Sequence, residues 1–289
     1  MTDSRINTQS LLIVGCGDLG LRAGKRLVAG DMTVVGSRRN PAALPEWMTP
    51  LAMDYTDRSS LAPIAEIAPD YLLLTQLPSD RSEAGYVRGF SEGMANVLDA
   101  LGSHRPAFTV MVSSTRVYAS ADGNWVDEGS PLALDDPRAV AIIEAERQLM
   151  DSGLAAAVVR FGGIYGMAQG RLLSRIAAGD INGPAPVVYG NRIHREDAAA
   201  FLAYLFDEAA AGRPLPGYYT GVDSAPAPRH EVERWLAEQL GVEAREMPPP
   251  ETAPAHKRCR NSAMLATGFT LAYPDYRAGY GEVLSRRSD

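Results

Sequence analysis

Short apolar runs alternate with stretches of helical periodicity along the first two thirds of the chain. The apolar runs are strand-sized and lie at residues 11–14, 32–35, 51–53, 71–74, 108–112 and 155–159. Between them, apolar positions spaced for one helix face predict helices at residues 18–27, 59–67, 82–101 and 138–150. Strands that are apolar throughout are typical of a parallel sheet covered by helices on both faces. The pattern therefore predicts an α/β fold with a doubly wound parallel sheet.

A glycine-rich stretch, Gly15-Cys-Gly17-Asp-Leu-Gly20, follows the first predicted strand and opens the first predicted helix. Glycine lets the backbone turn tightly and approach a phosphate without a Cβ in the way, and a helix amino terminus presents free N–H groups. In this context the pattern predicts a Rossmann-type cradle for a dinucleotide pyrophosphate, against the alternative of an incidental glycine-rich turn. The predicted cradle consists of Gly15, Gly17, Asp18, Leu19 and Gly20.

The end of the second predicted strand indicates which dinucleotide binds. An Asp or Glu at this point would bind the ribose hydroxyls of NAD, but the residues are Ser37, Arg38 and Arg39. Two guanidinium groups suit a 2′-phosphate through forked, charge-assisted hydrogen bonds. We therefore predict NADP as the preferred cofactor. NAD stays open, because the two arginines could also be solvated loop charges.

The alternation of strand-sized apolar runs and helical stretches becomes irregular after residue 166. Gly and Pro cluster at residues 179–186, and further helices are expected at residues 196–210 and 229–240. We predict a Rossmann dinucleotide-binding domain at residues 1–165, to which residues 187–222 return. Residues 166–186 and 223–289 form a smaller substrate-binding lobe in this interpretation.

The amino-acid composition limits the kinds of partner and ligand that are expected. Acidic residues outnumber basic ones, 35 against 28, and no basic stripe is present, which argues against nucleic acid. No apolar run is long enough to span a membrane, and residues 1–10 lack the apolar segment of a secretory signal, so we expect a cytoplasmic protein. With two cysteines and four scattered histidines, neither a disulfide framework nor a metal site is expected.

Four stretches resemble the extended short-chain dehydrogenase/reductases, the NAD(P)-dependent epimerase and dehydratase group. They are Asp54-Tyr-Thr-Asp57, Val112-Ser-Ser-Thr-Arg-Val-Tyr118, Arg160-Phe-Gly-Gly-Ile-Tyr-Gly166 and Arg192-Ile-His-Arg-Glu-Asp197. The resemblance implies further cofactor contacts from Asp54, Tyr55, Thr75, Gln76, Leu77, Pro78, Ser113, Phe161, Gly162, Gly163 and Ile164. It also implies a small-molecule substrate. Because members of the family often pair through the helices expected at residues 82–101 and 138–150, it leaves a homodimer open.

The residues at the family's catalytic positions differ from the family's pattern. Ser114 holds the place of the family's catalytic hydroxyl, although a strand-end capping serine is the alternative. The family's catalytic Tyr, followed four positions later by Lys, is missing, since the matching positions fall on about Arg138 and Ile142. Tyr118 or Tyr165 could supply the acid instead. Thr115 and Arg116 replace the acidic pair that a dehydratase needs.

Two functions therefore remain. The first is an NAD(P)-dependent oxidoreductase or epimerase acting on a small polar substrate, with a sugar nucleotide as one option. The second is a non-catalytic NADP(H)-binding sensor or regulatory protein. Arg171, Arg192 and His194 are the candidate substrate contacts. Their alternatives are solvated surface charges and a structural histidine at a helix start.

Overall fold

A seven-stranded sheet forms the centre of the fold in the computed structural model, which describes residues 9–30, 32–120, 122–251 and 255–286. Across the sheet the strands run in the order β12 (Gly217–Gly221), β7 (Ala156–Phe161), β5 (Phe108–Ser114), β4 (Tyr71–Leu74), β1 (Ser10–Val14), β2 (Thr33–Arg38) and β3 (Thr49–Ala52). The β1–β2, β1–β4, β2–β3 and β4–β5 pairs are all parallel. The predicted doubly wound sheet is therefore confirmed, and its strand order reverses between β1 and β4, where α/β folds bind their ligands.

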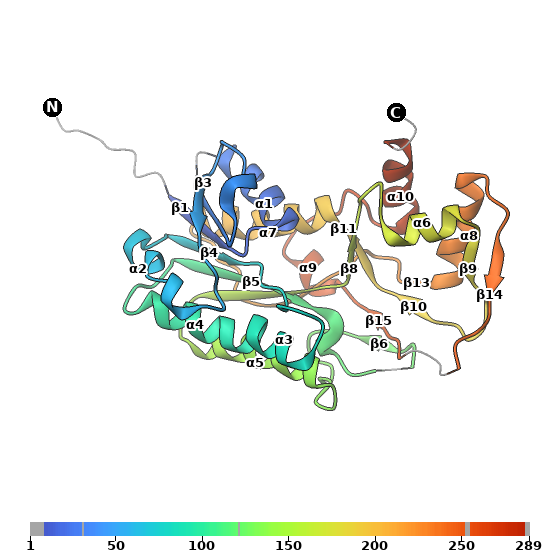
Figure 1. Cartoon of the computed structure of the whole chain (residues 1–289), viewed down its shortest axis with the longest axis horizontal. Helices are drawn as coiled ribbons and strands as arrows, with labels where there is room; N and C mark the ends of the chain where they lie inside the picture. Colours follow the sequence, from blue (N-terminus) through green and yellow to red (C-terminus); the bar gives the residue numbers. More distant parts are fainter. Residues whose placement is uncertain (1–8, 31, 121, 252–254, 287–289) are drawn as a thin grey trace. The chain divides into compact units, whose positions relative to one another are not determined.

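Helices cover both faces of this sheet. They are α1 (Asp18–Val28), α2 (Pro63–Ile67), α3 (Glu83–Tyr86), α4 (Gly93–Leu101), α5 (Pro137–Asp151) and α7 (Arg195–Ala210). Figure 1 shows α1 and α7 on one side of the strands and α3, α4 and α5 on the other. Phe206 of α7 packs edge-on against Tyr71 of β4 and Phe108 of β5, which seals the α7 side with aromatic rings.

The chain divides into two compact units. The first comprises Met1–Val117, Leu134–Arg160 and Ala199–Tyr218, and the second comprises Tyr118–Ala133, Phe161–Ala198 and Tyr219–Asp289. The sequence placed residues 118–133, 161–165, 187–198 and 219–222 with the nucleotide-binding domain, whereas their contacts group them with the second unit. One reason is that β6 (Trp125–Val126) pairs with β15 (Arg258–Cys259), which lies in the predicted substrate lobe. β8 (Gly163–Tyr165) and β11 (Arg192–His194) pair with each other and belong to the same unit.

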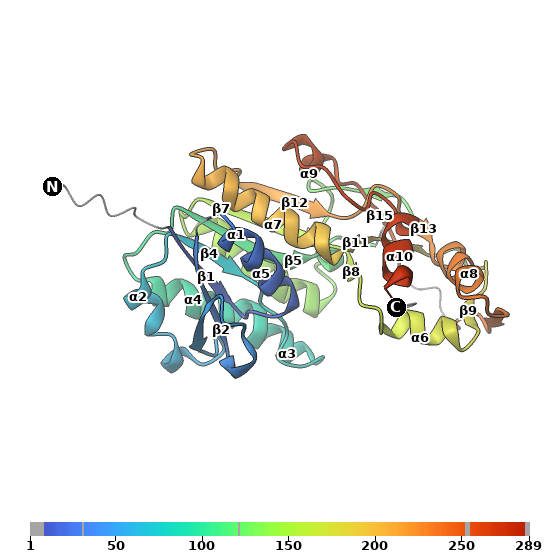
Figure 2. The ribbon, with the colours of Figure 1, turned by 90° about the horizontal axis from the view of Figure 1, so that it is seen from above.

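The second unit is built around three helices, α6 (Arg171–Ala177), α8 (Arg229–Leu240) and α10 (Tyr276–Ser285), which lie together in Figure 2. Their apolar faces share one buried core that includes Ile176, Leu236 and Tyr280. The remaining elements are short: β9 (Asp180–Asn182), β10 (Tyr189–Gly190), β13 (Ala227–Pro228), β14 (Arg245–Met247) and α9 (Ser262–Ala266). No helix in the described ranges has the length and apolar character to cross a membrane.

The expected helix at residues 82–101 is interrupted. Between α3 and α4 lies a π-helical stretch, Val87–Glu92. Gly89 sits inside it, and a Cβ at this position would collide with the Leu77 carbonyl oxygen and lie 2.7 Å from Pro78 Cα. Only glycine therefore lets this stretch approach the loop after β4. The wider turn matches the association of π-bulges with functional sites.

Replacing Gly89 with alanine tests this close approach. We expect Gly89→Ala to lower the free energy of unfolding by about 2–3 kcal/mol in urea denaturation, because both neighbours are backbone atoms that cannot rotate away. Gly281→Ala is the matched control, since Gly281 lies in α10 with nothing within 4 Å of the added Cβ. Equal stabilities of the two variants would show that the approach is not tight.

Candidate functional site

The glycine loop joins β1 to α1 at the point where the strand order reverses. Gly15 has a φ of +78°, and a Cβ there would lie 3.0 Å from the Thr75 carbonyl oxygen. Gly17 is the N-cap of α1 and has no side-chain cap, so the first N–H groups of this helix are left for a ligand. The Asp18 carboxylate bonds to Arg22 at 3.0 Å, one turn along the helix. The predicted cradle is thus open at the helix terminus, where anions bind.

Backbone bonds hold the loop against its neighbouring strands. The Cys16 N–H donates to the Ser37 carbonyl oxygen at 2.7 Å, while the Ser37 hydroxyl donates to the Ile13 carbonyl oxygen at 3.0 Å. Ser37 is therefore a buried bridge between β1 and β2. Burial raises the pKa of the Cys16 thiol to about 11, so it is an uncharged part of the wall.

A cleft of about 400 Å³ opens beside the loop. It is lined by residues from the ends of β1, β2, β3 and β4: Gly15, Cys16, Gly17, Arg38, Arg39, Asn40, Met53, Asp54, Tyr55, Thr56, Thr75, Leu77, Pro78 and Ser79. Within the described residues neither Arg38 nor Arg39 forms an ion pair. The cleft therefore presents two arginines at the end of β2, and the Asp54 carboxylate lines the same cleft.

Tyr55 ties two walls of the cleft together. Its hydroxyl donates to the Leu77 carbonyl oxygen at 2.9 Å and accepts the Leu77 N–H at 3.0 Å. Burial is the main reason that the pKa of Tyr55 lies above its usual value. The Asp54 carboxylate accepts from the Thr56 N–H at 3.0 Å, which shapes the turn that carries Tyr55.

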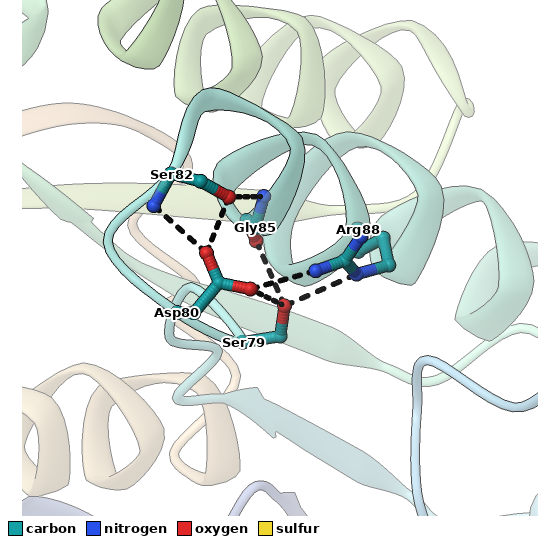
Figure 3. Close-up of polar contacts among 5 residues, drawn as sticks. All are labelled: Ser79, Asp80, Ser82, Gly85 and Arg88. Atoms are coloured by element: carbon teal, nitrogen blue, oxygen red, sulfur yellow. Dashed lines mark hydrogen bonds and ion pairs between the residues drawn. The ribbon is translucent and has the colours of Figure 1, made fainter.

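A polar network fixes the loop that follows Pro78 (Figure 3). The Asp80 carboxylate accepts from the Ser82 N–H and hydroxyl and forms a 2.7 Å ion pair with Arg88. Arg88 also donates to the Ser79 hydroxyl at 3.2 Å, and Ser82 caps α3 by accepting the Gly85 N–H. Hydrogen bonds from Ser82 hold the pKa of Asp80 below its usual value. The network anchors Ser79, which lines the cleft.

Gln76 stands directly after β4 as an unsatisfied group. Its side chain is 1% exposed, and neither amide atom has a partner within the described ranges. A buried carboxamide without partners is costly, so it calls for water or a ligand group beside it. Thr75 by contrast is engaged, because its hydroxyl donates to the Gly15 carbonyl oxygen at 2.9 Å.

A buried ion pair lies beneath the end of β5. Glu146 of α5 and Arg160 of β7 are 2% and 4% exposed and meet at 2.7 Å. The Ser113 hydroxyl donates to the same carboxylate at 2.5 Å, and the Tyr218 ring stacks on the Arg160 guanidinium at 4.5 Å. Ser113 is thereby a structural partner of this pair. Its neighbour Ser114 accepts the Arg116 N–H at 3.2 Å, and its own O–H stays available.

Two arginines lie beside the ring of Tyr86 on the α3 side of the sheet. The guanidinium groups of Arg116 and Arg138 each lie 5.9 Å from the Tyr86 ring centroid. Arg116 pairs with Asp136 at 2.7 Å, whereas Ile142 is buried in the core. A guanidinium can donate hydrogen bonds here but cannot release a proton at neutral pH.

The remaining predicted residues belong to the second unit. Phe161 is buried, the Gly162 and Gly163 N–H groups donate to the Gly221 and Asn191 carbonyl oxygens, and Ile164 is exposed. Tyr118 is fully buried with its hydroxyl 2.6 Å from Thr220 Oγ1, so this phenol is engaged in the core. Arg171 is exposed at the start of α6.

His194 and Arg192 are both buried on β11. The His194 ring packs 4.1 Å from the Tyr273 ring centroid, and its Nδ1 accepts the Glu196 N–H at the start of α7. These contacts match the structural alternative for His194. His194 Nε2 lies 3.5 Å from a Glu282 carboxylate oxygen. Arg192 and Tyr165 each keep a polar atom without a hydrogen-bond partner within the described ranges.

Comparison with known proteins identifies the family. Residues 15–209 match the family model described as NAD(P)H-binding. A solved structure from Methylobacillus flagellatus, described as an NAD-dependent epimerase/dehydratase, is 33% identical, covers 98% of this chain and 99% of that chain, and superposes with a TM-score of 0.81. The chain therefore belongs to the NAD(P)H-binding proteins of the epimerase/dehydratase type. The predicted family, fold and cofactor class are confirmed.

Two further relatives extend the comparison. The human epimerase family protein SDR39U1, solved with NADPH, is 19% identical with a TM-score of 0.75, covering 96% of this chain and 99% of that chain. A Streptomyces protein named 3-diazoavenalumate denitrifying reductase is 27% identical over 285 residues, 84% of this chain and 89% of its own length. The likeness to a reductase agrees with an oxidoreductase-type enzyme.

Sequence reasoning missed Glu146, Tyr86 and Asp223 as site residues. Glu146 meets Arg160 across 14 positions and two elements, so no local spacing marks the pair. Asp223 is 1% exposed with one carboxylate oxygen unpartnered in the described part of the chain. Only the fold shows that it is buried.

No group of three or more His, Cys, Asp and Glu that could hold a metal is found among the described residues.

Glu146 offers a direct test of the buried ion pair. We expect Glu146→Ala to lower the free energy of unfolding by about 3–5 kcal/mol, because it leaves the Arg160 charge buried without its carboxylate. Glu144→Ala, which removes an exposed partner of Arg147 from the same helix, should change stability by about 1 kcal/mol or less. Similar losses for both variants, measured by urea denaturation, would contradict this assignment.

Proposed function

We propose that the protein is an NADP(H)-dependent reductase of a small polar substrate that works without the Tyr–Lys dyad. The observation that carries the proposal is the pair Arg38 and Arg39, which line the cleft beside an uncapped helix terminus and have no carboxylate partner in the described ranges. A 2′-phosphate would satisfy both guanidinium groups.

The residues present fit a bound dinucleotide. The cleft beside Gly15 is a cradle that a Cβ would obstruct, and the amide of Gln76 lacks partners inside the described ranges. In this assignment the α1 amino terminus binds the pyrophosphate, Arg38 and Arg39 bind the 2′-phosphate, and Asp54 and Tyr55 lie at the adenine. NADPH, when bound, supplies a hydride.

Ser114 is the residue proposed to orient the substrate. Its hydroxyl accepts the Arg116 N–H, which leaves the O–H free to donate to a substrate oxygen. Arg116 and Arg138 support developing negative charge by hydrogen bonding but do not transfer a proton. This set of residues favours hydride transfer to an acceptor that needs no proton from the protein. Epimerisation needs a group that both gives and takes a proton, so reduction is the better fit.

The relative from Streptomyces supports reduction, because it is named as a reductase and matches most of this chain. A non-catalytic NADP(H) sensor remains the competing function, and loss of the dyad is the observation that favours it. Turnover separates the two. We expect NADPH fluorescence to fall when the protein is incubated with a panel of carbonyl and diazo compounds, and binding of NADPH without oxidation by any of them would favour the sensor.

Coenzyme preference is the first test. We expect NADPH to bind at least about tenfold more tightly than NADH, and Arg38→Ser or Arg39→Ser to remove about tenfold of NADPH affinity while NADH affinity is kept. Thermal-shift titration of each coenzyme measures this. Arg58→Ser is the control, because Arg58 pairs with Asp99 outside the cleft. Comparable wild-type affinities for the two coenzymes would overturn the phosphate assignment.

Ser114 is the second test. With any substrate that the panel identifies, Ser114→Ala should lower turnover by about a hundredfold while NADPH affinity is unchanged, since its hydroxyl acts on the reacting oxygen. Thr115→Ala removes the adjacent hydroxyl and should keep turnover. Full turnover by Ser114→Ala would leave this serine with only its capping role.

A further inference from the structure

Two buried side chains and one half-buried tyrosine of the second unit have buried polar atoms that lack hydrogen-bond partners among the described residues. Arg192 is 8% exposed and Asp223 is 1% exposed. Within the described residues, Arg192 Nη1, Asp223 Oδ2 and the Tyr165 hydroxyl all lack hydrogen-bond partners. One such atom can be an isolated defect, but three in one place are unusual in a native interior. They indicate a site that a ligand completes.

Short links hold the three groups in one cluster. The Asp223 N–H donates to the Arg192 carbonyl oxygen at 2.6 Å. Tyr165 lies on β8, which pairs with β11 so that Arg192 stands opposite Gly163 and His194 opposite Tyr165. The Tyr165 ring centroid is 4.4 Å from that of Tyr280. The Tyr165 phenol lies within electrostatic range of both Arg192 and Asp223, although burial is the main reason that its pKa is raised.

Two glycines make room for the polar ends of these side chains. A Cβ on Gly190 would lie 2.7 Å from Arg192 Nη2. A Cβ on Gly279 of α10 would overlap the Tyr165 hydroxyl. Glycine at these two positions therefore lets the guanidinium and the phenol lie where they do, because a Cβ at either position would collide with them.

We propose that Arg192, Asp223 and Tyr165 bind the carboxylate of a monoanionic substrate, whose apolar body packs against the tyrosine rings around them. The proposal rests on the proposed function, because it names the substrate class of that reductase. Arg192 donates N–H and Tyr165 donates O–H to the carboxylate oxygens. The rings of Tyr276 and Tyr280, which are 3% and 6% exposed, border this cluster, and the Arg192 guanidinium lies 5.8 Å from the Tyr276 ring centroid.

The charged groups around Asp223 favour a ligand with one negative charge over a ligand with two. The charged and titratable groups that face Asp223 are Arg192 from β11, Asp197 from α7, Asp275 before α10, and the phenols of Tyr165 and Tyr280. One guanidinium among these carboxyl groups can offset one negative charge but not the two of a phosphate. Burial raises the pKa of Asp223 to about 7, so below this pH its neutral carboxyl can donate a third hydrogen bond.

The protonation state of the Asp223 carboxyl determines how the affinity for a carboxylate ligand changes with pH. Below about pH 7 the neutral Asp223 donates to the bound carboxylate, and above it the ionised Asp223 repels the ligand. If the neutral form alone binds, carboxylate affinity falls about tenfold between about pH 6 and about pH 8. Removing the titrating group should abolish this fall.

Benzoate is the probe, because it joins one carboxylate to an aromatic body. We expect the full-length protein to bind benzoate saturably in NMR titrations, with the pH dependence given above. Asp223→Asn should retain binding and lose the pH dependence. Arg192→Met should weaken binding at least about tenfold, whereas Arg234→Met, an exposed arginine of α8 paired with Glu246, should not.

Several results would overturn the assignment: no saturable benzoate binding, unchanged affinity in Arg192→Met, or an unchanged pH dependence in Asp223→Asn. Tighter binding of inorganic phosphate than of benzoate, in competition, would also overturn it. Should Arg192→Met fail to fold, the pH profile of Asp223→Asn decides alone. NADPH affinity is measured in the same samples, so that loss of coenzyme binding with intact benzoate binding counts against the reductase and not against this site.

Discussion

The nucleotide cleft depends on the close approach of three backbone segments at the carboxyl ends of β1, β2 and β4. Gly15 has no room for a Cβ against Thr75, and Cys16 is bonded to the end of β2 through its amide. A side chain at the first glycine would push these segments apart, because the atom it meets belongs to the backbone. The uncapped amino terminus of α1 is held in place by this contact, and the anion site exists because the segments cannot separate.

Near the end of β5, polar side chains form a buried network that stabilises the fold. Glu146 and Arg160 form a buried pair that also engages the Ser113 hydroxyl. Such a pair requires all its hydrogen bonds, since a lone buried charge is strongly destabilising. Ser114, also at the end of β5, takes no part in this pair, and its hydroxyl accepts the Arg116 N–H. The chemistry available there is hydrogen bonding, and this limits the reactions that the site can support.

Location distinguishes the arginines of the two proposed binding sites. Arg38 and Arg39 line the cleft beside the glycine loop. Arg192 is 8% exposed and keeps one guanidinium nitrogen without a hydrogen-bond partner among the described residues. By contrast, Arg175 is paired with Glu233 and Arg245 with Asp180. We propose that anions from outside the chain, one on the coenzyme and one on the substrate, bind the first three arginines.

The sequence by itself determined the parallel sheet, the glycine cradle and the family, because these depend on local patterns: apolar runs, glycines at fixed offsets and short motifs in order. It also contains no Tyr that is followed four positions later by Lys. The π-helical interruption at Val87–Glu92 and the pair of Glu146 with Arg160 were decided by the tertiary structure, since each depends on a neighbour distant in sequence. Asp223 gives the clearest case, because an isolated Asp carries no signal until the fold has buried it beside Arg192.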